Sequence, residues 1–233
     1  MGKFYIKIIV EGNEEKAFFD IVDQIGKDNK FVLDVEDAKG YGGIADAFLS
    51  ALREGELFDC VICVFDVDNR LADKNSPYTR TRKQLFSIFG NEKAVDAVSF
   101  CTNPNILQYF LLAADTLDKV SLKLTSKAEN TPLIHKYWPT IASGKKDKYG
   151  RSMKSCYDAS AWQLEIIKYS IINEEYSYVS LLENSRVLPI DYKTNLPGGN
   201  LLPLLIALKA GDEDFFKQIH DLIDSCSWGA LPY

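Results

Sequence analysis

Two carboxylates, Asp66 and Asp68, stand directly behind an unbroken apolar run, Cys60–Phe65, which reads CVICVF. A short run rich in β-branched residues is typical of a strand that is buried on both faces of a sheet. Open parallel sheets carry their chemistry at the carboxyl ends of strands, and Asn69 adds another oxygen there. Oxygen ligands suit a hard divalent cation such as Mg²⁺. The segment therefore predicts a metal site or, alternatively, a strand that ends in a solvated acidic turn.

A third carboxylate, Glu11, closes the first predicted strand, Lys3–Val10, whose β-branched and aromatic residues favour a strand. The carboxyl ends of neighbouring parallel strands meet at one edge of a sheet. If the first and third strands are neighbours, we expect Glu11, Asp66 and Asp68 to lie together at that edge.

Two helix starts follow predicted strands. Asn13 can cap the first helix, and Glu14 and Glu15 then lie in its first turn, where the helix dipole favours acids. The second start follows a glycine-rich turn, residues 39–43, which could let backbone approach a phosphate. Its spacing matches neither the P-loop nor the dinucleotide-binding motif, so it fits a plain tight turn as well.

The strands and helices alternate, which predicts an α/β fold with a mostly parallel sheet flanked by helices and right-handed crossovers. Thr102-Asn103-Pro104 predicts a turn after the fourth strand, because a proline disfavours helix in the residue before it. The predicted strands are 3–10, 30–35, 60–65 and 94–101, and the helices are 13–26, 44–52, 78–88 and 105–117.

Basic residues gather in two places. Arg70, Lys74, Arg80 and Arg82 follow the carboxylates and could hold a phosphodiester against a bound metal ion, or could simply solvate a helix face. Residues 119–155 contain nine Lys or Arg against two acids, in a chain whose net charge is −6. Phosphate-rich partners bind such surfaces, although a solvated lysine-rich loop has the same composition.

Within the basic segment, aromatic residues lie among the cations, a mixture that suits single-stranded or unstacked nucleic acid. The cations that we expect to contact nucleic acid are Lys145, Lys146, Lys148 and Arg151.

Bulk properties indicate a soluble globular protein, with 46% apolar and 26% charged residues and no apolar run near the ~18 residues that cross a bilayer. Five cysteines without framework spacing predict a reduced, cytoplasmic protein. Cys60 and Cys63 form a C-x-x-C inside the buried strand, which argues against a zinc or redox role. We expect an α/β domain over residues 1–118, followed over 119–233 by a basic connector and a helical subdomain with helices 159–178, 201–210 and 212–225.

Three segments together resemble a known family: IIVEGNEEKAFFDIV, VICVFDVDN and FCTNPNILQYFLLA. The first two resemble the TOPRIM domain of topoisomerases, primases and OLD-type nucleases, in which a Glu follows the first strand and an Asp-x-Asp follows the third. The third resembles the RloB-like branch, a stand-alone TOPRIM group linked to bacterial restriction and phage-defence loci. The resemblance covers residues 3–117. It departs from that branch at Leu107, where a Glu is usual, and at Tyr109, where a Trp is usual.

The resemblance implies that Asp66 and Asp68 hold Mg²⁺ or Mn²⁺, and that Glu11 acts as general acid/base or completes the metal shell. A bound cation offsets charge on a phosphate and lowers the pKa of an attacking water, and a nearby carboxylate can move the proton. The expected activity is metal-dependent hydrolysis of DNA or RNA, in phage defence or nucleic-acid processing. By family analogy, a partner ATPase is also expected.

Two other functions fit parts of the sequence. The altered RloB-like segment also suits a nucleic-acid-binding or effector module that keeps the fold without turnover. VFDVDNRL is similar to the first motif of haloacid-dehalogenase-type phosphatases, in which Asp66 would be the nucleophile. Against the phosphatase, Arg70 occupies the usual Thr position, and the motif lies on the third strand rather than the first.

Overall fold

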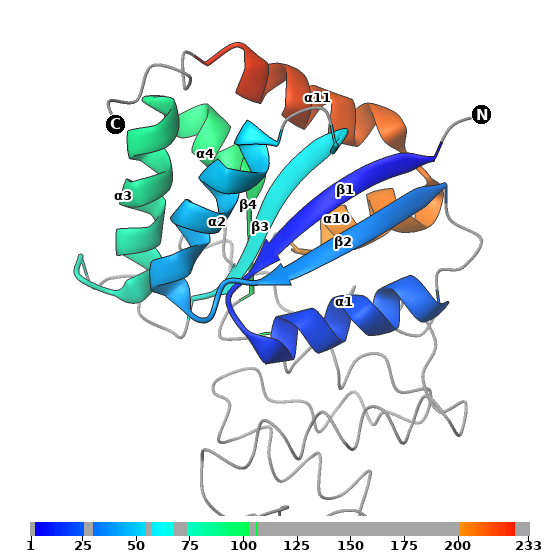
Figure 1. The fold of residues 1–233 in the computed structure, drawn as a ribbon, viewed down its shortest axis with the longest axis horizontal. Helices are drawn as coiled ribbons and strands as arrows, with labels where there is room; N and C mark the ends of the chain where they lie inside the picture. The colour runs from blue at the N-terminus through cyan, green and yellow to red at the C-terminus, as the bar shows by residue number, and fades with distance from the viewer. Residues whose placement is uncertain are drawn as a thin grey trace, which may run out of the picture. The chain divides into compact units, whose positions relative to one another are not determined.

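A four-stranded, all-parallel sheet forms the centre of the computed structural model, which describes residues 3–25, 30–54, 57–67, 74–102, 106 and 201–226 (Figure 1). The strand order is β2-β1-β3-β4. This confirms the predicted α/β fold with a parallel sheet flanked by helices. The strands are β1 (Phe4–Val10), β2 (Phe31–Asp37), β3 (Cys60–Asp66) and β4 (Ser99–Thr102).

Helices cover both faces of the sheet (Figure 1). Phe216 packs against Phe4 and Phe31 on one face, with ring centroids 6.1 and 5.0 Å apart. Tyr78 packs against Phe65 on the opposite face. The helices are α1 (Asn13–Ile25), α2 (Tyr41–Arg53), α3 (Pro77–Phe89), α4 (Glu92–Val98), α10 (Leu201–Ala210) and α11 (Glu213–Asp224). Among the helices that the structure describes, none combines the length and apolar composition that crossing a membrane requires.

The register of the sheet brings the carboxyl ends of the first and third strands together. Val10 of β1 pairs with Val64 of β3, and Asp66 at the end of β3 pairs with Thr102 of β4. The first and third strands are therefore neighbours, which was the condition for Glu11 and Asp66 to meet.

The fourth predicted strand, 94–101, was wrong over its first half, which is helical. The Asn91 side chain accepts a hydrogen bond from the backbone N–H of Lys93 (2.9 Å) and caps the start of α4. The helix ends at Val98, and β4 begins at Ser99. The buried apolar residues of this stretch fit a helical repeat as well as a strand, and the cap decides between them. Thr102, predicted in a turn, is the last residue of β4.

The two carboxyl-terminal helices belong to the same compact unit as the sheet, whereas the predicted boundary near residue 118 separated them from it. α11 contacts β3 and α4, and α10 contacts β4. The predicted helices 105–117 and 159–178 and the basic segment 119–155 lie outside the described residues, apart from Ile106.

Candidate metal centre

Three carboxylates meet at the carboxyl edge of the sheet: Glu11, Glu15 and Asp66. One ligand oxygen from each lies within 4.8 Å of the others. Glu15 and Asp66 are buried, with 3% and 6% of their surfaces exposed, and Glu11 is partly exposed. This geometry could hold a metal ion, because clustered carboxylate oxygens are the ligands that hard cations prefer.

Glu11 is held by the neighbouring strand β3 and by the turn before α2. Its backbone N–H donates to the Val64 carbonyl (3.1 Å), and its own carbonyl accepts from the Gly40 N–H (2.6 Å). Its side-chain Oε2 accepts from the backbone N–H of Asp66 (3.2 Å). The prediction that Glu11 and Asp66 lie together therefore agrees with the structure.

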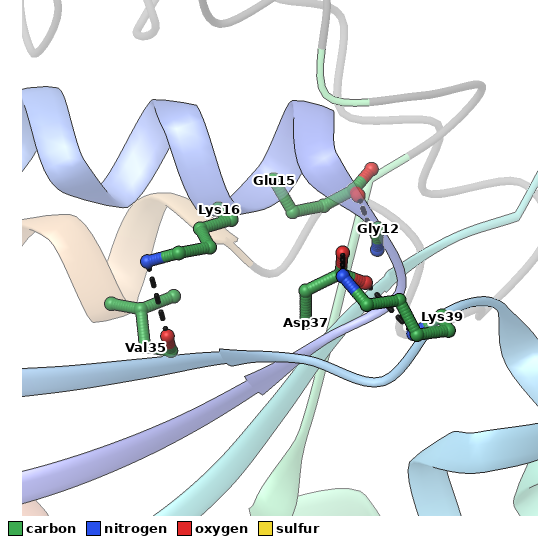
Figure 2. Close-up of polar contacts among 6 residues, drawn as sticks. All are labelled: Gly12, Glu15, Lys16, Val35, Asp37 and Lys39. Carbon is green, nitrogen blue, oxygen red and sulfur yellow. Dashed lines mark hydrogen bonds and ion pairs between the residues drawn. The ribbon is translucent and has the colours of Figure 1, made fainter.

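Glu15 is the ligand candidate that sequence reasoning missed. α1 begins at Asn13, and Gly12 accepts the first helical bond, from the N–H of Lys16 (3.1 Å). Glu15 bends back so that its Oε2 accepts from the Gly12 N–H (2.9 Å), as Figure 2 shows. This is one half of a capping box, which gives Glu15 a structural reason to point at the strand end. The available signal was the spacing: β1 ends at Val10 and the chain turns at once into α1, which brings Glu15 back beside Glu11.

Asp66 is held from two sides. The Thr102 hydroxyl on β4 donates to Oδ1 of Asp66, and the Tyr41 hydroxyl on α2 donates to its backbone carbonyl (2.8 Å). Tyr41 is fixed in turn by Thr81 of α3, whose hydroxyl donates to the Tyr41 carbonyl (3.3 Å). Both the carboxylate and the backbone carbonyl of Asp66, the last residue of β3, are therefore fixed by neighbouring elements.

Charged carboxylates this close repel one another, and burial strengthens the repulsion. Two lysines near the cluster bond to other groups. Lys39 pairs with Asp37 at the end of β2 (2.5 Å), and Lys16 donates to the Val35 carbonyl (3.2 Å), both shown in Figure 2. A divalent ion between the carboxylates would offset the repulsion.

The glycine-rich turn has a structural explanation. Gly40 has φ 108°, a conformation that favours glycine. A Cβ on Gly43 would lie 2.1 Å from the Ala38 carbonyl oxygen, so only glycine fits. The turn leads from β2 into α2 and contacts Glu11 through Gly40. Its form is that of the tight turn predicted as one alternative.

The other predicted site residues have different places. Asp68, Arg70 and the four cations Lys145, Lys146, Lys148 and Arg151 lie outside the described residues. Lys74 and Arg80 are exposed. Arg82 bonds to Glu92 (3.3 Å) and Asp96 (2.5 Å), so it ties α3 to α4 and is engaged in protein contacts.

The C-x-x-C pair does not form a ligand set. Cys60 and Cys63 lie three residues apart on β3, so their side chains point to opposite faces of the sheet. Both are buried, and burial raises the pKa of each thiol well above its usual value. Protonated, buried thiols are poor nucleophiles and poor metal ligands.

With Mn²⁺ as the probe ion, we expect a metal-dependent gain in stability if the cluster binds the ion, and Glu15→Gln should weaken that gain. At about one hundred times its Kd, a ligand of the folded state adds about 2.7 kcal/mol to the free energy of unfolding. We expect Glu15→Gln, which removes one negative ligand, to lose at least about 1.4 kcal/mol of that gain, equal to tenfold weaker binding. Urea unfolding with Mn²⁺ or with EDTA measures the difference.

Glu14→Gln is the matched control, because Glu14 is the adjacent buried acid and is not one of the three clustered carboxylates. It should keep the full Mn²⁺ effect. Equal loss in both variants would contradict the assignment of Glu15.

Comparisons of the chain with protein-family models, with curated proteins and with solved structures gave no match. The TOPRIM resemblance therefore depends on the sequence segments quoted above, and the candidate metal centre depends on the geometry of Glu11, Glu15 and Asp66.

Proposed function

We propose that this chain is a TOPRIM-type, divalent-metal-dependent nuclease that hydrolyses phosphodiester bonds of DNA or RNA, in bacterial phage defence or nucleic-acid processing. The observation that supports the proposal is the meeting of Glu11, Glu15 and Asp66 at the carboxyl edge of a parallel sheet. The resemblance places a Glu and an Asp at these two strand ends. Oxygen-only ligands suit Mg²⁺ or Mn²⁺ as the ion.

The three carboxylates would have different roles, which follow from how exposed each one is. The buried Glu15 and Asp66 would hold the ion, with Asp68 as a further ligand by resemblance. When bound, the ion supplies positive charge against the scissile phosphate and lowers the pKa of a water ligand. Glu11, which is more exposed, would take the proton from the attacking water, as a general base does.

A cleavage screen tests the proposal. The purified chain is incubated with single- and double-stranded DNA, single-stranded RNA and tRNA, in Mn²⁺, Mg²⁺ or EDTA. We expect cleavage of at least one nucleic acid with Mn²⁺ and none in EDTA. Binding without cleavage in any metal would favour the effector-module alternative. Hydrolysis of para-nitrophenyl phosphate without cleavage of nucleic acid would favour the phosphatase. A partner ATPase remains a proposal by family analogy.

The basic segment should carry part of the binding to nucleic acid. Charge reversal at Lys145, Lys146 and Lys148 removes three cations that could neutralise phosphates. We expect at least about tenfold weaker binding at 0.1 M salt, and a slope of log K against log salt smaller by about three. Fluorescence anisotropy across a salt series measures both quantities. An unchanged slope would place the binding surface elsewhere.

A further inference from the structure

Thr102 lies opposite Asp66 in the register of β3 and β4 and is fully buried. Its hydroxyl donates to Asp66 Oδ1, and its backbone carbonyl accepts from the Val67 N–H (2.8 Å). One residue of β4 therefore contacts both the carboxylate of Asp66 and the peptide that follows it.

The position of this hydroxyl is rigid. Thr102 is β-branched, so its χ1 rotation is restricted, and it sits in a strand paired with β3. A hydrogen bond from a neutral hydroxyl to a carboxylate is charge-assisted and stronger than one between neutral groups. Because Asp66 is 6% exposed, water competes little for Oδ1. The bond therefore limits how the carboxylate can turn.

All three carboxylates of the candidate metal centre have one oxygen held by a protein donor. The donors are the Asp66 N–H for Glu11, the Gly12 N–H for Glu15 and the Thr102 hydroxyl for Asp66. Of these three donors, Thr102 alone uses a side chain. It is therefore the donor that a substitution can remove while the three carboxylates stay in place.

We propose that Thr102 is a positioning residue of the metal centre. Its hydroxyl sets the orientation in which Asp66 presents an oxygen toward the oxygens of Glu11 and Glu15, so that β4 helps to determine the affinity for the ion. This inference rests on the proposed function, since it assumes that the cluster binds a divalent cation. Groups that orient metal ligands in this way typically change metal affinity by about 10- to 100-fold when they are lost.

Thr102→Val and Thr102→Ser test the inference by isothermal titration of the full chain with MnCl₂. Valine keeps the shape and strand preference of threonine but cannot donate, and serine keeps the hydroxyl. We expect the Kd for Mn²⁺ to rise at least about tenfold in Thr102→Val. In Thr102→Ser, which restores the donor, it should stay within about threefold of the original value, a rescue that a role in packing alone would not give.

Ser99→Ala is the matched control. Ser99 is a buried hydroxyl residue at the other end of the same strand, β4, where it pairs with Cys63 and not with Asp66. Its loss should leave the Kd for Mn²⁺ unchanged. If Thr102→Val does not fold, Thr102→Ala removes the same donor and leaves room for water.

The outcomes separate the two proposals. Mn²⁺ binding by the unsubstituted chain, with an unchanged Kd in a folded Thr102→Val or Thr102→Ala variant, would overturn the role of Thr102 and leave the metal centre standing. Failure of the unsubstituted chain to bind Mn²⁺ would overturn both. Equal weakening in Thr102→Val and Thr102→Ser would also overturn the inference, because the hydroxyl would then not be the deciding group.

Discussion

Asp66→Asn is expected to lower Mn²⁺-dependent cleavage at least about a thousandfold, which corresponds to about 4 kcal/mol of transition-state stabilisation. Asparagine keeps the size of the side chain and an oxygen that can accept from Thr102, but it removes a negative charge from the centre of the cluster. Asp66 is buried at the end of β3, so water cannot readily compensate for the lost charge. Single-turnover cleavage of the best substrate from the screen measures the effect.

The same strand supplies the matched control. Asp59 immediately precedes β3 at its amino end, is exposed, and accepts a hydrogen bond from the Tyr5 N–H (2.7 Å). Asp59→Asn makes the same chemical change at the other end of the strand, so cleavage should stay within about twofold. Robust cleavage by Asp66→Asn would remove the assignment of Asp66, and equal losses in the two variants would point to a general effect on folding.

Part of the candidate site could be predicted because strand ends follow simple rules. The apolar runs that become β1 and β3 are long enough and sharply enough bounded to be recognised, and parallel strands share one carboxyl edge. The sequence alone left open which strands are neighbours, so the approach of Glu11 to Asp66 was conditional. The hydrogen bond between Glu11 and the Asp66 N–H shows that the condition holds.

The remaining site residues depend on contacts that local patterns do not contain. Glu15 reaches the cluster because the chain turns sharply between β1 and α1, and the Gly12 N–H in that turn holds the Glu15 carboxylate. Thr102 reaches Asp66 because β4 pairs with β3 in one particular register. A shift of one residue in that register would turn the hydroxyl to the other face of the sheet. The sequence predicted neither the register nor the start of β4.

The placement of the carboxyl-terminal helices was also beyond local patterns. The sequence predicted a helix over residues 212–225, and in the structure α11 has one buried apolar face formed by Phe216, Ile219 and Ile223. Helical spacing does not show which part of the protein the apolar face of α11 packs against. In the structure it covers the sheet, and Phe216 contacts two strands from the other end of the chain.

Phe216→Ala should destabilise the sheet itself, by about 3–5 kcal/mol, the usual cost of removing a fully buried phenylalanine ring. Phe216 is 0% exposed and packs on Phe4 and Phe31, so its loss leaves a cavity against β1 and β2. Hydrogen exchange of peptides from β1 and β3 should speed up by about a hundredfold or more where it reports global opening. Phe86→Ala is the control, because Phe86 is 39% exposed on α3 and should cost less than about 1 kcal/mol. If α11 were part of an independent helical subdomain, exchange in β1 and β3 would be the same in Phe216→Ala as in the unsubstituted chain.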